Sequence, residues 1–114
     1  MIQVHVDLAV DPAKEQEMLQ YFETEFRPAA LQFNGFIEVG MLSLRTALMG
    51  SAPPGINYRF ALTYESEELR QKWIAADIHQ KVWGHMESML TSMDYNVLLF
   101  DVAAARSVVT DTAR

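Results

Sequence analysis

The chain has 114 residues, half of them hydrophobic, and a formal net charge of −6. A chain of this length predicts one domain with an ample core, and its negative charge argues against nucleic acid or an anionic membrane surface as a partner. The sequence has no cysteine, which excludes disulfides and thiolate chemistry, and no run approaches the roughly 20 apolar residues of a membrane span.

The first predicted strand covers residues 2–10, where apolar and polar residues alternate. One face is expected to be aliphatic, and the other is expected to carry Gln3, His5 and Asp7, as in a half-buried strand. Because this pattern begins at once, we expect no signal peptide and a cytoplasmic protein.

Asp11-Pro12 predicts the start of a helix, with the aspartate as N-cap and the proline at the first helical position. Proline lacks a backbone donor, so the helix is expected to kink or end near Pro28. Asn34-Gly35 then indicates a turn. The expected buried stripe of the helix is Met18, Leu19, Phe22, Phe26 and Ala29.

Two further strands are predicted over residues 36–45 and 57–65. Between them, residues 46–55 contain two glycines and two prolines and predict a loop. About ten residues is long for a hairpin connection, where two to five are usual. The loop can be a lid, a partner contact or a solvated connection, and these alternatives stay open. One face of the earlier strand is expected to carry Ile37, Val39 and Met41. One face of the later strand is expected to carry Tyr58, Phe60, Leu62 and Tyr64.

Residues 66–90 predict two helices with a joint between them. Ser66 is the expected N-cap of the first helix, and Asp77 is the expected N-cap of the second. Gln80, three residues after Asp77, completes a capping-box-like pair. The second helix has a wide apolar arc, and a step of about 100° per residue places His79 inside that arc and His85 at its edge.

A fourth strand, predicted over residues 94–102, completes the order β-α-β-β-α-β. This order is the split βαβ pattern of the ferredoxin-like fold, an α+β class in which both helices cover one face of a four-stranded antiparallel sheet. Residues 1–102 form the predicted domain and residues 103–114 a C-terminal tail. The opposite face of the sheet carries charges of both signs, and it is either solvated or covered by a second subunit.

This layout resembles the antibiotic-biosynthesis-monooxygenase-like group of dimeric α+β barrel proteins. The matching pieces are the short first strand before the DP-started helix, the segment RPAALQFNGFIEV at residues 27–39, and the broken second helix with DIHQKVWGHMESML at residues 77–90. The resemblance implies a homodimer in which two sheets pack as a barrel, with a pocket between each sheet and its helices.

Members of the group differ in activity. Some oxidise quinol-like or anthrone-like polyketides with dioxygen and without a bound metal or flavin, others degrade haem, and others have no known reaction. Haem-degrading members use an asparagine in the first strand region, whereas this chain offers Gln3, His5 and Asp7 there. That difference disfavours haem degradation.

His79 is the candidate catalytic residue. On an apolar helix face it can take a proton from an acidic phenol, or it can be a core histidine that bonds a carbonyl or hydroxyl. His79 and His85 point about 240° apart on a continuous helix and cannot chelate one ion, so no metal site is predicted. The candidate substrate-binding residues, each of which can equally be a core residue, are Trp73, Trp83, Tyr64, Tyr95 and Met86.

The leading functional hypothesis is a cofactor-independent monooxygenase acting on a small quinol-like or anthrone-like aromatic substrate. No cofactor, nucleic acid or membrane partner is expected, and no phosphate loop or dinucleotide fingerprint occurs in the sequence. The alternative is a non-catalytic dimeric barrel that binds a small apolar ligand or serves in stress response. A haem-degrading enzyme is the third hypothesis.

Overall fold

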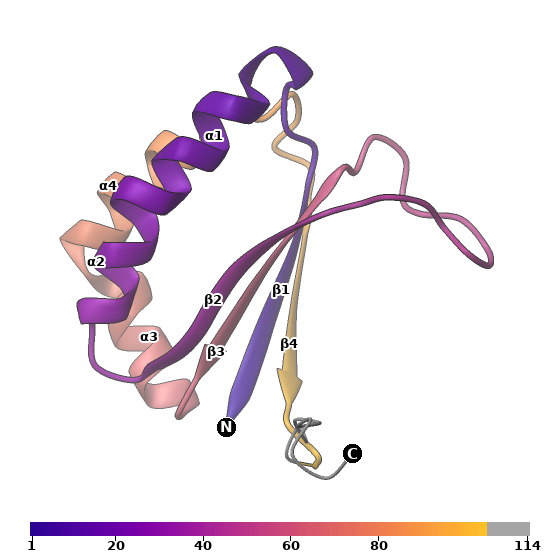
Figure 1. Cartoon of the computed structure of the whole chain (residues 1–114). Helices are drawn as coiled ribbons and strands as arrows, with labels where there is room; N and C mark the ends of the chain where they lie inside the picture. The colour runs from indigo at the N-terminus through magenta and orange to yellow at the C-terminus, as the bar shows by residue number, and fades with distance from the viewer. Residues whose placement is uncertain (105–114) are drawn as a thin grey trace, which may run out of the picture.

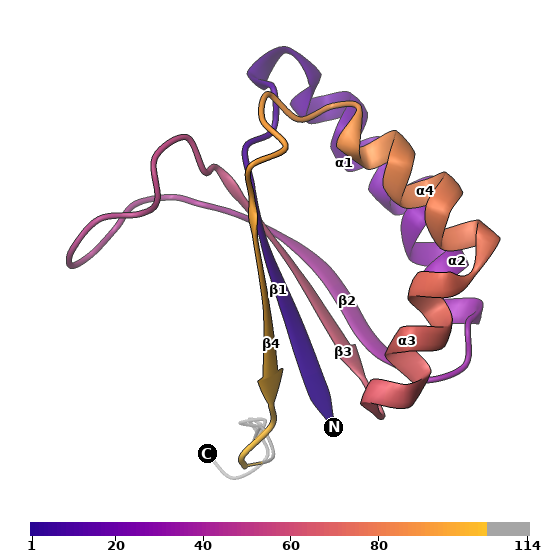
Figure 2. The same ribbon diagram turned by 180° about the vertical axis from the view of Figure 1, so that it is seen from behind.

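The computed structural model describes residues 1–104, so most of the tail expected at residues 103–114 lies outside the described residues. Four strands form one antiparallel sheet in the order β2-β3-β1-β4. Figures 1 and 2 show the helices together on one face of this sheet. The predicted ferredoxin-like α+β fold is therefore confirmed. The strands are β1 (Ile2–Leu8), β2 (Phe36–Ser43), β3 (Tyr58–Tyr64) and β4 (Asn96–Asp101).

The centre of the sheet follows directly from the alternation in the sequence. β1 lies between β3 and β4, and its Val4 is paired with Leu62 on one side and Leu99 on the other. The aliphatic face of β1 is buried under the helices, as is the predicted face of β3 from Tyr58 to Tyr64. Burial of these two faces supplies much of the hydrophobic stabilisation of the fold.

The first helix begins where Asp11-Pro12 predicted, with the Asp11 carboxylate accepting a hydrogen bond from the Ala13 amide at 3.0 Å. The segment then runs through a 3₁₀ turn (Pro12–Lys14), α1 (Glu15–Tyr21), a π-helical turn (Phe22–Phe26) and α2 (Arg27–Gln32). Of the two alternatives expected near Pro28, a kink or an end, the helix does not end there, and its irregularity is the π-helical turn just before the proline, which accommodates the missing donor and the ring.

The buried stripe of this helix differs in detail from the prediction. Residues four apart stay on one side because a π-helical turn holds more residues than an α-helical one. Leu19 was expected in the stripe but is exposed, and Ala29 is only partly buried. The fully buried residues of the stripe are Met18, Phe22, Phe26 and Ala30.

A bulge near the start of β2 changes the side on which one residue lies. The pairing with β3 shifts between Phe36 and Glu38, which leaves Ile37 as the extra residue. Ile37 consequently lies on the face away from the helices, beside Thr63, instead of with Val39 and Met41. The prediction that Ile37 shares one face of the strand with Val39 and Met41 is therefore wrong.

The two predicted helices of residues 66–90 are α3 (Glu67–Ala75) and α4 (Asp77–Glu87). The Ser66 hydroxyl accepts from the Leu69 amide at 3.2 Å, so this N-cap is confirmed. The predicted capping box at the joint is wrong, since Asp77 makes no capping bond and is the first helical residue. Gln80 instead donates to the carbonyl of Ile74 at 3.2 Å, which ties α4 to the end of α3.

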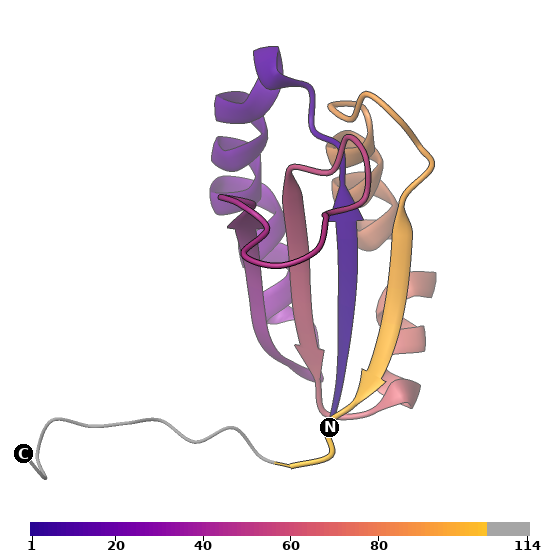
Figure 3. The same cartoon turned by 90° about the vertical axis from the view of Figure 1, so that its right-hand side faces the viewer.

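No helix in residues 1–104 covers the other face of the sheet, and the long loop predicted at residues 46–55 stands over part of it, near Asp7 and Arg59 (Figure 3). Figure 3 looks onto this face and shows the loop between β2 and β3 in front of the strands. Asn57 fixes the base of the loop, because its amide donates to the carbonyl of Val10 and accepts from the Val10 amide, both at 2.8 Å. The tip is solvated, with Leu48 96% exposed.

Candidate functional site

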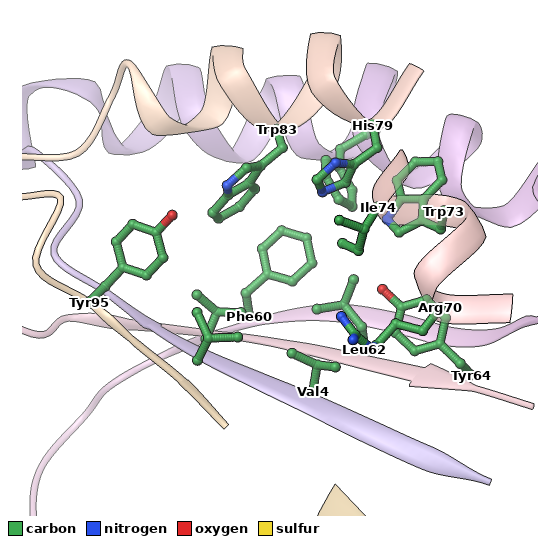
Figure 4. A pocket seen from close by; sticks show the side chains of 13 residues that line it. Val4, Phe60, Leu62, Tyr64, Arg70, Trp73, Ile74, His79, Trp83 and Tyr95 are labelled. Carbon is green, nitrogen blue, oxygen red and sulfur yellow. The ribbon is translucent and has the colours of Figure 1, made fainter. Parts of the chain in front are cut away.

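A cavity of about 140 Å³ lies between the sheet and the helices α3 and α4 (Figure 4). Val97 on the edge strand β4 borders the cavity and is 57% exposed, which places an opening at this edge of the sheet. No helix in residues 1–104 is long and apolar enough to cross a membrane. The residues around the cavity are Val4, Val6, Phe26, Phe60, Leu62, Tyr64, Arg70, Trp73, Ile74, His79, Trp83, Tyr95 and Val97.

His79 comes from the first turn of α4 and borders the cavity, as its position in the apolar arc predicted. Its Nδ1 atom is buried and has no hydrogen-bond partner of adequate geometry among the described residues. Burial lowers the pKa of His79 below its ordinary value, and the Ile74 carbonyl and the Glu87 carboxylate oppose this effect. The imidazole is therefore neutral at pH 7 and retains one nitrogen lone pair.

Both tryptophans border the cavity, but they are buried to different degrees. Trp73 is 1% exposed and packs edge-to-face on the rings of Phe26, Phe33 and Phe36. Trp83 is only partly buried and lies closer to the open side, with its ring facing Phe60 and Tyr95. Trp73 thus belongs to the core and to the cavity wall at once.

Tyr95 closes the cavity at the end opposite Tyr64 (Figure 4). Its hydroxyl donates to the Glu87 carboxylate at 2.6 Å, and its ring lies edge-to-face with that of Trp83. Burial raises the pKa of Tyr95, and the bond to Glu87 acts in the same direction. The phenol is therefore neutral and already engaged, which leaves it little capacity to bind a ligand oxygen.

Tyr64 and Arg70 form the other polar end of the cavity (Figure 4). Burial raises the pKa of Tyr64, so its hydroxyl keeps its proton at physiological pH. The Arg70 guanidinium donates two hydrogen bonds to Glu67, one of them at 2.7 Å. These bonds lower the pKa of Glu67 to about 2, so the pair is ionised and its charges cancel locally.

Two residues singled out from the sequence lie away from the cavity. Met86 is buried in the core and is not among the cavity residues. His85 is exposed and stacks on Tyr21, with 4.1 Å between the ring centroids. Within residues 1–104 no group of three metal-binding side chains occurs.

Arg70 and Glu87 are functional candidates that the sequence did not single out. The spacing of Arg70 to Glu67 is that of an ordinary ion pair on a helix surface, so it gives no sign of a cavity residue. Glu87 accepts a hydrogen bond from the Tyr95 hydroxyl, and this bond crosses the turn between α4 and β4. Only the three-dimensional path of that turn brings the side chains of Glu87 and Tyr95 together.

The fold and the cavity define the class: a ferredoxin-like α+β protein with a largely apolar pocket between its sheet and its helices. No protein-family model matches the sequence, and no curated protein matches it. Solved structures, by contrast, match over nearly the whole chain. Their sequences are identical to this chain at fewer than one residue in five, so the structural similarity shows the fold alone.

Three similar structures illustrate the range of proteins with this fold. A dimeric ferredoxin-like protein of unknown function from Jannaschia sp. CCS1 has a TM-score of 0.73 and 16% identity, covering 89% of this chain and 98% of that one. A provisionally named antibiotic biosynthesis monooxygenase from Caulobacter crescentus CB15 has a TM-score of 0.72 and 17% identity, covering 90% of each chain. Hydroxynitrile lyase from Passiflora edulis has a TM-score of 0.73 and 8% identity, covering 93% and 96%.

Other similar structures also carry the antibiotic biosynthesis monooxygenase name. The predicted resemblance to this group is therefore confirmed as a resemblance of fold. One fold can host many chemistries, so the activity has to be argued from the cavity itself.

Proposed function

We propose that the protein is a cofactor-independent monooxygenase that oxidises an electron-rich phenolic substrate in the cavity described above. The observation that supports this most directly is a neutral histidine, His79, at the wall of an otherwise largely apolar cavity. A buried imidazole with a free lone pair is a suitable general base near neutral pH. The names of several proteins with this fold favour the same chemistry.

In the proposed mechanism His79 takes the proton of the substrate hydroxyl, or of the acidic methylene in an anthrone. The resulting anion reacts through carbon with dioxygen to give a peroxide at that carbon. One oxygen atom remains on the carbon as a carbonyl group, and the other leaves as water with the two hydrogens that the substrate loses. The net reaction converts phenol and dioxygen to quinone and water, so dioxygen itself is the oxidant.

The other residues around the cavity have supporting roles in this proposal. Trp83 and Trp73 form aromatic walls against which a planar ring can stack. The hydroxyl of Tyr64 is available to orient a substrate oxygen, whereas Tyr95 mainly closes the cavity through its bond to Glu87. Apolar walls exclude water, which protects a reactive carbanion from protonation by solvent. Met86 acts only through packing of α4 on the core.

Oxygen consumption by the purified, metal-free protein tests this proposal. We expect uptake with at least one member of a panel of phenols, quinols and anthrones, without any added cofactor and with one dioxygen consumed per quinone formed. An oxygen electrode and product analysis by mass spectrometry measure both quantities, and the product should contain one atom of ¹⁸O from labelled dioxygen. No uptake across the panel would favour the alternative, a non-catalytic protein that binds a small apolar ligand.

We further propose that the protein forms a homodimer through the sheet face that the helices leave uncovered. Several large apolar side chains are exposed on this face. They lie beside an ion pair in which the Nε atom of Arg59 is 2.8 Å from the Oδ1 atom of Asp7. Exposed apolar surface of this kind marks an interaction site. The loop of residues 44–57 stands over the same face (Figure 3) and is positioned to reach across a second copy. The exposed apolar residues of this face include Ile37, Leu42, Leu98 and Phe100.

Replacing Leu98 with glutamate should convert this dimer to a monomer, because the new charge would be buried at the interface without a partner. Leu98 is 48% exposed in the single chain. The matched control is Leu31→Glu on α2, where the leucine is 52% exposed but lies on the helical layer. Light scattering during size-exclusion chromatography should show the control as a dimer. A wild-type protein that is monomeric at micromolar concentration would rule out the interface.

A further inference from the structure

We infer that the cavity is a binding site for a neutral, single-ring phenol whose hydroxyl group donates a hydrogen bond to His79. This inference rests on the proposed function in so far as the cavity is the substrate site. It narrows the substrate class from quinol-like and anthrone-like compounds to those with one ring. Three independent features of the cavity carry it: its size, its charge balance and its one basic nitrogen.

The size of the cavity matches one aromatic ring. An apolar cavity of about 150 Å³ in a protein core binds benzene, and the cavity here measures about 140 Å³. A six-membered ring with one or two small substituents fits this space. A skeleton of three fused rings exceeds this space, so it would have to project into water through the opening beside Val97 or displace walls that include Phe60 and Leu62, two buried residues of β3.

The charges around the cavity favour a ligand without net charge. The cation that borders the cavity, Arg70, is already bound to the carboxylate of Glu67 through two hydrogen bonds. A second carboxylate, Glu87, lies behind Tyr95 at the other end. An anionic ligand such as a benzoate would therefore be desolvated without gaining an unpaired cation, which is costly in an apolar site.

His79 gives the site a hydrogen-bond acceptor. The buried Nδ1 atom of His79 makes no hydrogen bond with the described residues, and the ring borders the cavity. A neutral imidazole carries a proton on one ring nitrogen and a lone pair on the other, so Nδ1 can accept a hydrogen bond when Nε2 carries the proton. A phenolic O–H is the ligand group that matches this lone pair. An ether of the same shape has no proton to donate and cannot make the bond.

Calorimetric titrations under anaerobic conditions at pH 7 test the inference without any turnover. The probes are phenol, anisole, benzoate and the three-ring phenol hydroxyanthracene. We expect phenol to bind about tenfold more tightly than anisole, because one hydrogen bond to a buried acceptor contributes about that factor in affinity. We expect benzoate and hydroxyanthracene to bind more weakly than phenol. In His79→Phe, which keeps a ring but removes the nitrogens, phenol and anisole should bind equally. His85→Phe, on the outer surface of the same helix, should keep the wild-type preference.

The outcomes separate this inference from the proposed reaction. Three results would overturn the inference. The wild-type protein could bind phenol and anisole with equal affinity, or it could bind hydroxyanthracene as tightly as phenol. It could also fail to bind phenol at millimolar concentration. Oxygen uptake with anthrones alone would leave the monooxygenase in place but overturn the single-ring substrate. The predicted order of affinities without any oxygen uptake would support the ligand class and reject the oxygenase.

Discussion

His79→Gln should lower the rate of cofactor-free oxygen uptake by about 100- to 10,000-fold, the usual contribution of a general base. Glutamine has a similar length and can still donate a hydrogen bond, but it cannot accept a proton at neutral pH. The rate is measured with whichever substrate of the panel the wild-type protein oxidises. His85→Gln is the matched control, because His85 lies on the same helix but is exposed and stacks on Tyr21. It should retain the wild-type rate within about twofold.

The pH dependence of the wild-type rate gives a second measure of the role of His79. Only the neutral imidazole can act as the base, and burial lowers its pKa below the ordinary value of 6.5. The rate should therefore be constant around pH 7 and fall on acidification, with a midpoint below 6.5. The residual activity of His79→Gln should lack this acidic limb. A substitution that leaves both the rate and the acidic limb unchanged would exclude His79 as the base.

Trp73→Ala should lower the free energy of unfolding by about 3–5 kcal/mol, the typical cost of truncating a large buried aromatic side chain. Trp73 is 1% exposed and joins α3 to the first helix and to β2 through its contacts with Phe26, Phe33 and Phe36. Urea denaturation followed by circular dichroism measures the change, which should appear as a lower midpoint with an unchanged slope.

Two further variants keep this prediction measurable. Trp73→Phe retains a ring and should cost less than Trp73→Ala, so it reports on the site even if the alanine variant does not fold. Trp83→Ala should cost less than Trp73→Ala, because Trp83 is only partly buried and faces the cavity. Equal losses for both alanine variants would show that Trp73 is not the principal core residue of the pair.

The site was only partly predictable from the sequence. The helical period placed His79 and Met86 in the same apolar arc of α4, yet His79 borders the cavity and Met86 lies in the core. Periodicity gives the direction of a side chain about one helix axis, whereas the distance to the sheet depends on how the helix is tilted and tied to its neighbours. The bond from Gln80 to Ile74, which no local pattern predicted, is part of that placement.

The sequence by itself determined the order of the elements and most of their faces. Alternation in residues 2–8 and 58–64 and the N-caps Asp11 and Ser66 are local signals, because the side chain and the backbone it affects are close in the chain. The tertiary structure decided what depends on distant segments: the bulge that turns Ile37 outward and the Tyr95–Glu87 bond that closes the cavity. The physical reason is that a register shift or a polar pair depends on the packing of the whole chain. Residues far apart in the sequence contribute to that packing together, so no local pattern specifies the outcome.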